Sequence, residues 1–260
     1  MPRLPEELVN KRGEYFINTF RPCDSRQKMA HIHLEDGAFT PFWLIVWNLI
    51  AFAIMGAALL ALRRQKASPR RLAIAGMCAA VGFAVFQIEV PTPFGPAHMN
   101  FTPLIGILIG PSLGSVVVLV VNVFSAAIGH GGWGMIGPNS IVNIVEVILG
   151  YYGFRFFKNG LKRGYYWSGL SSTVIALTVS SLLVVLVVGA SEIQGSSITR
   201  QQTINNMLVL AALNIVTGVI EGVVTGYVVA FLGRVRPDLL AHHMVGEPPY
   251  TIDAVPAGGS

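Results

Sequence analysis

The chain of 260 residues is 53% hydrophobic and only 12% charged, which is too apolar for a soluble domain of this size and typical of an integral membrane protein. The formal net charge of +5 does not indicate nucleic-acid binding, because the basic residues lie mostly in short loops beside apolar stretches. Two cysteines, Cys23 and Cys78, exclude a disulfide framework and do not have the spacing of a metal site.

Residues 1–30 are polar, of mixed charge, and without an apolar run long enough for a signal peptide, so we expect a polar N-terminal extension. Two histidines and two carboxylates follow immediately before the first apolar segment: His31, His33, Glu35 and Asp36. Two imidazoles on alternate residues can form part of a transition-metal site. A surface His-x-His beside acidic residues more commonly binds nothing, so this stretch alone does not decide between the two.

The apolar segments predict an all-α, polytopic membrane bundle of about seven transmembrane helices. The third segment is too short to cross a membrane unless it is joined to its neighbours, and Gly110-Pro111 separates it from the fourth. The Pro-rich residues 237–260 are expected to form a disordered cytoplasmic tail, which leaves 31–236 as the transmembrane domain. The predicted segments are 41–62, 72–90, 101–109, 113–128, 140–157, 167–189 and 204–232.

Clusters of Lys and Arg at 63–71, 155–163 and 234–236 lie at segment ends that alternation places on the same side of the membrane. By the positive-inside rule these ends are cytoplasmic, so the N-terminus lies outside and the C-terminus inside. The count then places His33, His98 and His130 on the outer face, in Gly- and Pro-rich loops that hold few cations. Any one of these histidines could merely cap a helix, but their co-location with Glu35 and Asp36 favours a metal site.

Two acids, Glu146 and Glu221, fall inside predicted membrane segments, where a charged group is costly. They either form a proton or cation pathway or, as we favour, bond to Asn, Ser or backbone groups of neighbouring helices. Small residues recur every four positions at Ala53, Ala57 and Ala61 and at Gly218, Gly222 and Gly226. Such stripes allow close helix approach, either within the bundle or to a partner subunit.

The segment His33-Leu34-Glu35-Asp36-Gly37-Ala38-Phe39-Thr40-Pro41 resembles the N-terminal metal-binding motif of the CbiM/NikM family, the substrate-binding component of cobalt/nickel energy-coupling-factor transporters. Three further segments agree in order. They are His98 with residues 104–111, residues 129–139 from Gly129-His130 to Pro138-Asn139, and residues 219–226 running on to 237.

The resemblance implies a non-enzymatic, seven-helix protein of the cell membrane that captures Co²⁺ or Ni²⁺ as transported substrate. A transmembrane coupling (T) subunit, cytoplasmic ATPase subunits and a small accessory membrane subunit would be its partners. It implies that His33 and His98 are metal ligands. His130 and Asn139 match a loop that closes over the site and would support or gate it, as would Glu35 and Asp36.

One departure from the family concerns the amino terminus. In the family the first ligand histidine directly follows the mature N-terminus, whose amine joins the site, whereas here 32 residues precede His33. Either His31 replaces the missing amine, or translation starts at Met29 and Met29-Ala30-His31 supplies an amine, amide nitrogens and an imidazole.

Two other functions remain open from the sequence. The chain could be a self-contained metal transporter in which Glu146 or Glu221 relays protons, or a membrane interaction or sensor protein that works through its polar N-terminal extension. No HExxH, Walker-type loop or nucleophile elbow supports an enzyme.

Overall fold

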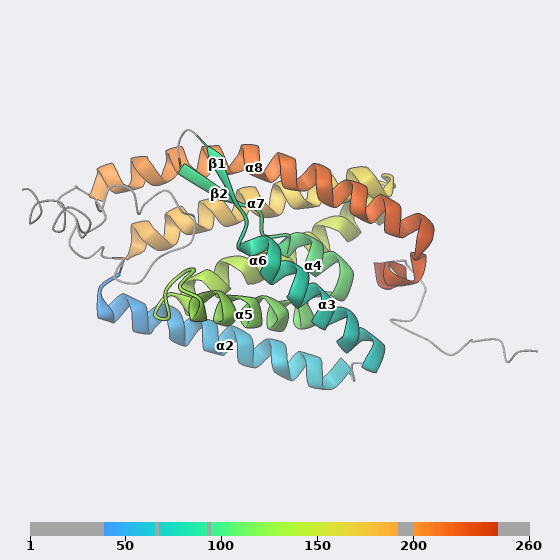
Figure 1. Cartoon of the computed structure of the whole chain (residues 1–260), viewed down its shortest axis with the longest axis horizontal. Helices are drawn as coiled ribbons and strands as arrows, with labels where there is room; N and C mark the ends of the chain where they lie inside the picture. The colour runs from blue at the N-terminus through green and yellow to red at the C-terminus, as the bar shows by residue number, and fades with distance from the viewer. Residues whose placement is uncertain (1–38, 66–67, 93–94, 192–199, 244–260) are drawn as a thin grey trace, which may run out of the picture.

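The computed structural model describes residues 39–65, 68–92, 95–191 and 200–243. Within these ranges the chain is a bundle of seven α-helices with one β-hairpin (Figure 1), so the expected all-α membrane bundle is confirmed. The helices are α2 (Pro41–Gln65), α3 (Pro69–Phe86), α4 (Thr102–Ile109), α5 (Pro111–Ala127), α6 (Ile136–Arg155), α7 (Tyr165–Ala190) and α8 (Arg200–Val235).

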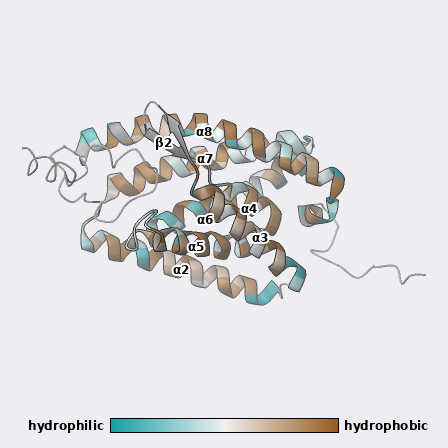
Figure 2. Ribbon diagram, viewed as in Figure 1, coloured by the Kyte–Doolittle hydropathy of each residue, from teal (hydrophilic) through white to brown (hydrophobic). Residues whose placement is uncertain are grey.

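Five of these helices are long and apolar enough to cross a membrane, namely α2, α3, α6 with its π-helical extension Phe156–Gly160, α7 and α8. The apolar helix α5 has 17 residues, while α4 has eight and at 1.5 Å per residue reaches only about 12 Å. As the sequence predicts, Gly110 separates α4 from α5, with a left-handed φ of 83° that favours glycine. Figure 2 shows apolar residues along the helices and hydrophilic residues gathered toward helix ends.

The short helix α4 lies at the centre of the bundle. Ile107 and Ile109 are fully buried, and glycines allow the backbone of α4 to meet that of α6 on two levels, at Gly106 against Val147 and at Gly150 against Pro103. Ile105 and Val147 belong to one buried apolar cluster with residues of α2, α3 and α5. Contacts with α3, α5, α6 and α7 therefore fix the position of α4 within the bundle.

The glycine stripe of α8 is used within the bundle. Gly218, Gly222 and Gly226 face Leu177, Val174 and Tyr166 of α7, so this stripe has the first of the two uses that the sequence left open, packing within the bundle. On α2, by contrast, Ala53 and Ala57 are exposed and remain a candidate docking face.

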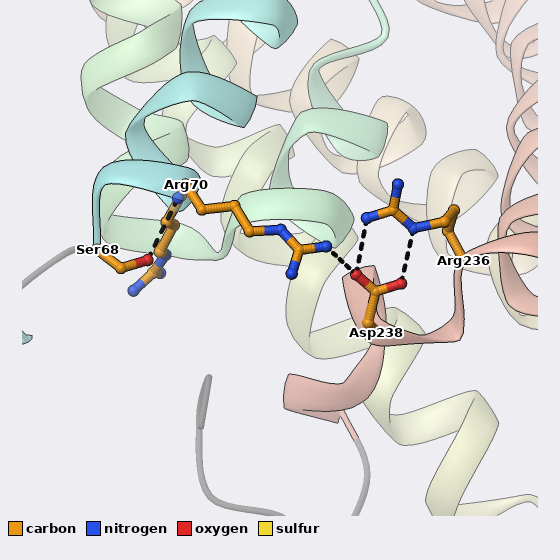
Figure 3. Close-up of polar contacts among 5 residues, drawn as sticks. Ser68, Arg70, Arg236 and Asp238 are labelled. Atoms are coloured by element: carbon orange, nitrogen blue, oxygen red, sulfur yellow. Dashed lines mark hydrogen bonds and ion pairs between the residues drawn. The ribbon is translucent and has the colours of Figure 1, made fainter. Parts of the chain in front are cut away.

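Residues 237–243 pack onto the end of the bundle where the basic residues lie, whereas we expected the chain to become a disordered tail at residue 237. Two short 3₁₀ helices, Pro237–Leu239 and Ala241–His243, bring Leu240 and His243 into buried positions. Figure 3 shows how Asp238 joins this segment to the helices, because Arg70 of α3 and Arg236 both reach its carboxylate. The buried Leu240 and these ion pairs are contacts that the Pro-rich composition of the tail does not reveal.

Two boundaries next to the loops of His98 and His130 also differ from the expectation. The second segment was predicted to run to residue 90, but α3 ends at Phe86, and Glu89 already belongs to a strand. The loop 129–139 was predicted to be non-helical throughout, but α6 begins at Ile136. Proline is well accommodated in the first turn of a helix, so Pro138 does not delay the start of α6.

Candidate functional site

A β-hairpin connects α3 to α4 and carries His98. Strand β1 (Glu89–Thr92) pairs antiparallel with β2 (Gly95–His98), and His98 stands opposite Glu89 in the last pair of the ladder. The hairpin crosses α7 and α8 in the view of Figure 1, and β2 contacts α8. The backbone of His98 therefore lies at the base of the hairpin, two residues before Asn100.

Asn100, Phe101 and Thr102 form the turn between the hairpin and α4. Phe101 adopts the left-handed conformation, with φ 50° and ψ 21°, which is uncommon for a bulky residue. The Asn100 side-chain oxygen accepts a hydrogen bond from the Thr102 backbone N–H at 3.2 Å and lies 3.1 Å from the Thr102 hydroxyl oxygen. The asparagine thus stabilises the first turn of α4 by bonding to the chain two residues on.

Both intramembrane acids converge on this turn. Glu221 of α8, which is 1% exposed, accepts the backbone N–H of Asn100 on one carboxylate oxygen at 3.1 Å and that of Phe101 on the other at 3.0 Å. Glu146 of α6, which is 4% exposed, accepts from the Asn100 side-chain amide at 2.8 Å and from the hydroxyls of Thr102 and Ser180. The expectation that these acids bond to Asn, Ser or backbone groups is confirmed.

His130 and Asn139 lie in and just after the loop between α5 and α6. The His130 backbone N–H donates to the Ser125 carbonyl at 2.9 Å, and its ring packs edge-on against Phe86 with centroids 6.1 Å apart. Asn139 is buried in the first turn of α6, and a Cβ atom on Gly131 would lie 3.6 Å from its amide nitrogen. The structure therefore brings this histidine loop and Asn139 together.

The same loop is tied to the start of α2. Asn48 of α2 donates to the Gly134 carbonyl at 2.8 Å and accepts from the Gly137 N–H at 3.2 Å. Phe39, only six residues after His33, is buried in one apolar cluster with Met135 of the loop. The chain that leads away from His33 therefore enters the bundle beside the His130 loop.

The predicted ligands and supporting residues His31, His33, Glu35 and Asp36 lie outside the described residues, and His98 is described by its backbone. Among the residues that the structure describes, no three His, Cys, Asp or Glu side chains lie close enough to hold a metal ion. The convergence of His33, His98 and His130 stays a prediction.

The sequence analysis missed Asn100 and Thr102 of the turn and Ser180 of α7 as partners of the acids. One signal was available for Asn100, because Asn followed by x-Thr-Pro at the start of an apolar run is a pattern that initiates helices. Nothing in the sequence singled out Ser180, which lies among four other serines of α7.

Three comparisons with known proteins agree on the kind of protein to which this chain is similar. A family model described as "Cobalt uptake substrate-specific transmembrane region" matches residues 33–239. A metal transport protein of Haloquadratum walsbyi is 31% identical over 217 residues, which cover 80% of this chain and 93% of that protein.

Further relatives are named for two different metals. The cobalt transport protein CbiM of Sorangium cellulosum is 27% identical, with 80% of this chain and 94% of that protein covered. A fused nickel transport protein of Archaeoglobus fulgidus is 26% identical, with 80% of this chain and 68% of that protein covered. The crystal structure of a transition metal transporter superposes with a TM-score of 0.67 at 21% identity, covering 78% of this chain and 93% of that one, so it shares the fold.

Proposed function

The chain belongs to the CbiM family of substrate-specific transmembrane proteins of cobalt uptake, and from that membership we propose that it is the membrane component that captures Co²⁺ or Ni²⁺ for import. The observation that carries the proposal is the family match over residues 33–239, which begins at His33 and spans all seven helices. Relatives are named for both metals, so the proposal covers both.

The proposed ligands are His33 and His98, with His31 as a further ligand. Imidazole nitrogen suits both Co²⁺ and Ni²⁺. His130 and Asn139, with Glu35 and Asp36, would support or gate the site. This assignment is supported by the burial of Phe39 beside the His130 loop, because six residues link it to His33.

The amino-terminal ligand has two forms under this proposal. If the chain begins at Met1, His31 supplies the additional imidazole; if it begins at Met29, the terminal amine and amide nitrogens do so. The intact mass of the purified protein decides between them, because a chain that starts at Met1 rules out the second form.

We further propose that the chain works in the cell membrane with its N-terminus outside, as the substrate-binding part of an energy-coupling-factor transporter. A T subunit, cytoplasmic ATPase subunits and a small accessory membrane subunit would complete it and supply the energy. In support, ten Lys and Arg side chains lie at the end of the bundle opposite the His130 loop: Arg63, Arg64, Arg70, Arg71, Arg155, Lys158, Lys162, Arg163, Arg234 and Arg236. Exposed Ala53 and Ala57 of α2 offer one docking face.

The rival function, proton-coupled transport by the chain alone, has less support. A proton relay needs acids that can exchange partners or reach water, whereas Glu146 and Glu221 are buried and each accepts several hydrogen bonds from fixed protein donors. Metal uptake into liposomes by the purified chain, driven by a pH gradient without ATPase subunits, would favour the rival.

Metal binding by the full chain tests the proposal. In calorimetry with Co²⁺ and Ni²⁺, we expect His98→Ala and His33→Ala each to lower the affinity at least tenfold, because each removes one ligand nitrogen. His243→Gln serves as the control, since His243 lies at the opposite end and its ring Nε2, 2.8 Å from the Ile107 carbonyl oxygen, can be replaced by an amide. Unchanged affinity in both ligand variants would refute the site.

A further inference from the structure

We propose that Glu146 and Glu221 are positioning residues for metal capture: together they clamp Asn100, Phe101 and Thr102, the turn that joins His98 to α4. The inference rests on the proposed function, because it assigns His98 as a metal ligand. It gives the two buried acids a task other than proton transfer.

Glu221 fixes the backbone of the turn. Its two carboxylate oxygens receive the consecutive N–H groups of Asn100 and Phe101, one each. A carboxylate that bridges two successive amides sets the orientation of the peptide between them. This contact also offsets the cost of the left-handed conformation of Phe101, which is unfavourable for a residue with a bulky side chain.

Glu146 fixes the side chains of the same turn. One of its oxygens accepts from both the Asn100 amide and the Thr102 hydroxyl, and the other accepts from Ser180 of α7 at 2.6 Å. Asn100 is the common member, because its side chain bonds to Glu146 while its backbone bonds to Glu221. Helices α6, α7 and α8 therefore all hold one turn.

The consequence for His98 follows from the chain geometry. On one side His98 belongs to the last pair of the hairpin ladder, and on the other only Met99 separates it from Asn100. Successive Cα atoms are 3.8 Å apart, so the Cα of His98 lies within about 7.6 Å of that of Asn100. Binding sites work best when their ligands are held to within about 0.5 Å, and the clamp restricts how far the chain at His98 can move.

Glutamine substitutions distinguish the two acids. A glutamine at position 146 can keep its side-chain oxygen toward Asn100 and Thr102 and donate a hydrogen bond from its amide to Ser180. The Ser180 hydroxyl can then donate to the Leu177 carbonyl oxygen, 3.0 Å away. Gln at 221 must turn its amide group toward a backbone N–H, so two donors would face each other. We expect Glu146→Gln to bind Co²⁺ within about threefold of the wild type, and Glu146→Ala and Glu221→Gln each to lose at least tenfold.

The neighbouring serines of α7 provide a matched pair of variants. Both hydroxyls lie within hydrogen-bond distance of the Leu177 carbonyl, but Ser180 reaches Glu146 while Ser181 accepts from Asn214 of α8. We expect Ser180→Ala to weaken Co²⁺ binding about threefold or more and Ser181→Ala to leave it unchanged.

The experiment measures Co²⁺ affinity by calorimetry on the full chain and, without metal, amide hydrogen exchange at residues 95–102. The expected result is faster exchange in Glu221→Gln and Glu146→Ala than in the wild type and Glu146→Gln, together with the affinity losses above. Wild-type exchange or wild-type affinity in Glu221→Gln would overturn the inference, even while a loss in His98→Ala upholds the metal site. A wild-type protein that binds no Co²⁺ or Ni²⁺ would overturn the proposed function and, with it, the role of the acids in metal capture. The exchange data would still report whether the acids hold the turn.

Discussion

At Gly106 the backbone of α4 comes so close to α6 that a Cβ atom would lie 2.1 Å from the Val147 carbonyl oxygen. We expect Gly106→Ala to lower the free energy of unfolding by about 1–3 kcal/mol, because two helix backbones must separate in a packed core. Thermal unfolding of the detergent-solubilised protein measures this. Gly76→Ala is the control, because no atom lies within 4 Å of the new Cβ. Alanine stabilises a helix by about 0.5–1 kcal/mol relative to glycine, so this variant should not be less stable than the wild type. Equal melting of the two variants would contradict the close contact.

Individual residues also show where the sequence stops being informative. The energetic cost of a charge inside a membrane predicts that Glu146 and Glu221 need partners, and the structure supplies them. This energetic cost does not predict which groups become the partners, because Asn100 and Glu221 lie 121 residues apart and meet only after three helices have packed. The left-handed Phe101 is equally invisible in the sequence, since phenylalanine has no preference for that conformation.

Among the elements, α7 and α8 pack through the glycine stripe of α8, which gives a graded prediction. A Cβ on Gly218 would meet only side-chain atoms of Leu177, at 3.3 and 3.5 Å. On Gly222 it would lie 2.9 Å from a Val174 methyl carbon and 3.1 Å from the Leu170 carbonyl oxygen, and on Gly226 it would lie 2.8 Å from the Tyr166 carbonyl oxygen. Side chains can yield more easily than backbone.

We therefore expect the melting temperatures of the three alanine variants to fall in the order Gly218→Ala, Gly222→Ala, Gly226→Ala, with the first near the wild type. The last should lose about 1–3 kcal/mol. Thermal unfolding measured side by side provides the ranking, and the reverse order would show that this helix pair is not packed as described.

Elements longer than about 15 residues could be predicted from the sequence because membrane thickness limits the length of each apolar run and basic residues mark alternate ends. The hairpin β1–β2 could not be predicted. Pro91, Pro93 and Pro96 suggest a turn, and two four-residue strands leave no periodic signal. The element that carries His98 was therefore the least predictable part of the site, whereas His98 itself was singled out by the predicted topology and by the resemblance to the family.

On the scale of the whole molecule, the segment after α8 closes the basic end of the bundle. Asp238 bonds to Arg236 and Arg70, and the Arg236 guanidinium holds the pKa of this carboxyl below its usual value. His243 lies deeper, with its ring against Tyr151 and Phe154 and its Nε2 2.8 Å from the Ile107 carbonyl. The segment thus joins α3, α4, α6 and α8.

This closure makes the stability of the bundle depend on pH through His243. Burial is the main reason that the pKa of His243 is lowered from 6.5 to about 4, because the charged ring would lose its hydration. A base with a depressed folded pKa is protonated first in the unfolded chain, so stability is full above pH 6.5 and falls as the pH drops toward 4, by up to about 3 kcal/mol. Asp238 titrates below its ordinary 3.8 and lies outside this window.

Substituting His243 isolates this contribution from that of other titrating groups. The variant His243→Gln can keep a hydrogen bond to Ile107 but has no ring to protonate, so its melting temperature should fall less than that of the wild type between pH 7 and pH 4.5. Calorimetric or fluorescence melting of both proteins at four or five pH values measures the difference. Parallel curves would mean that His243 does not gain a proton on unfolding, and therefore that residues 237–243 are not seated against α4 and α6 in solution.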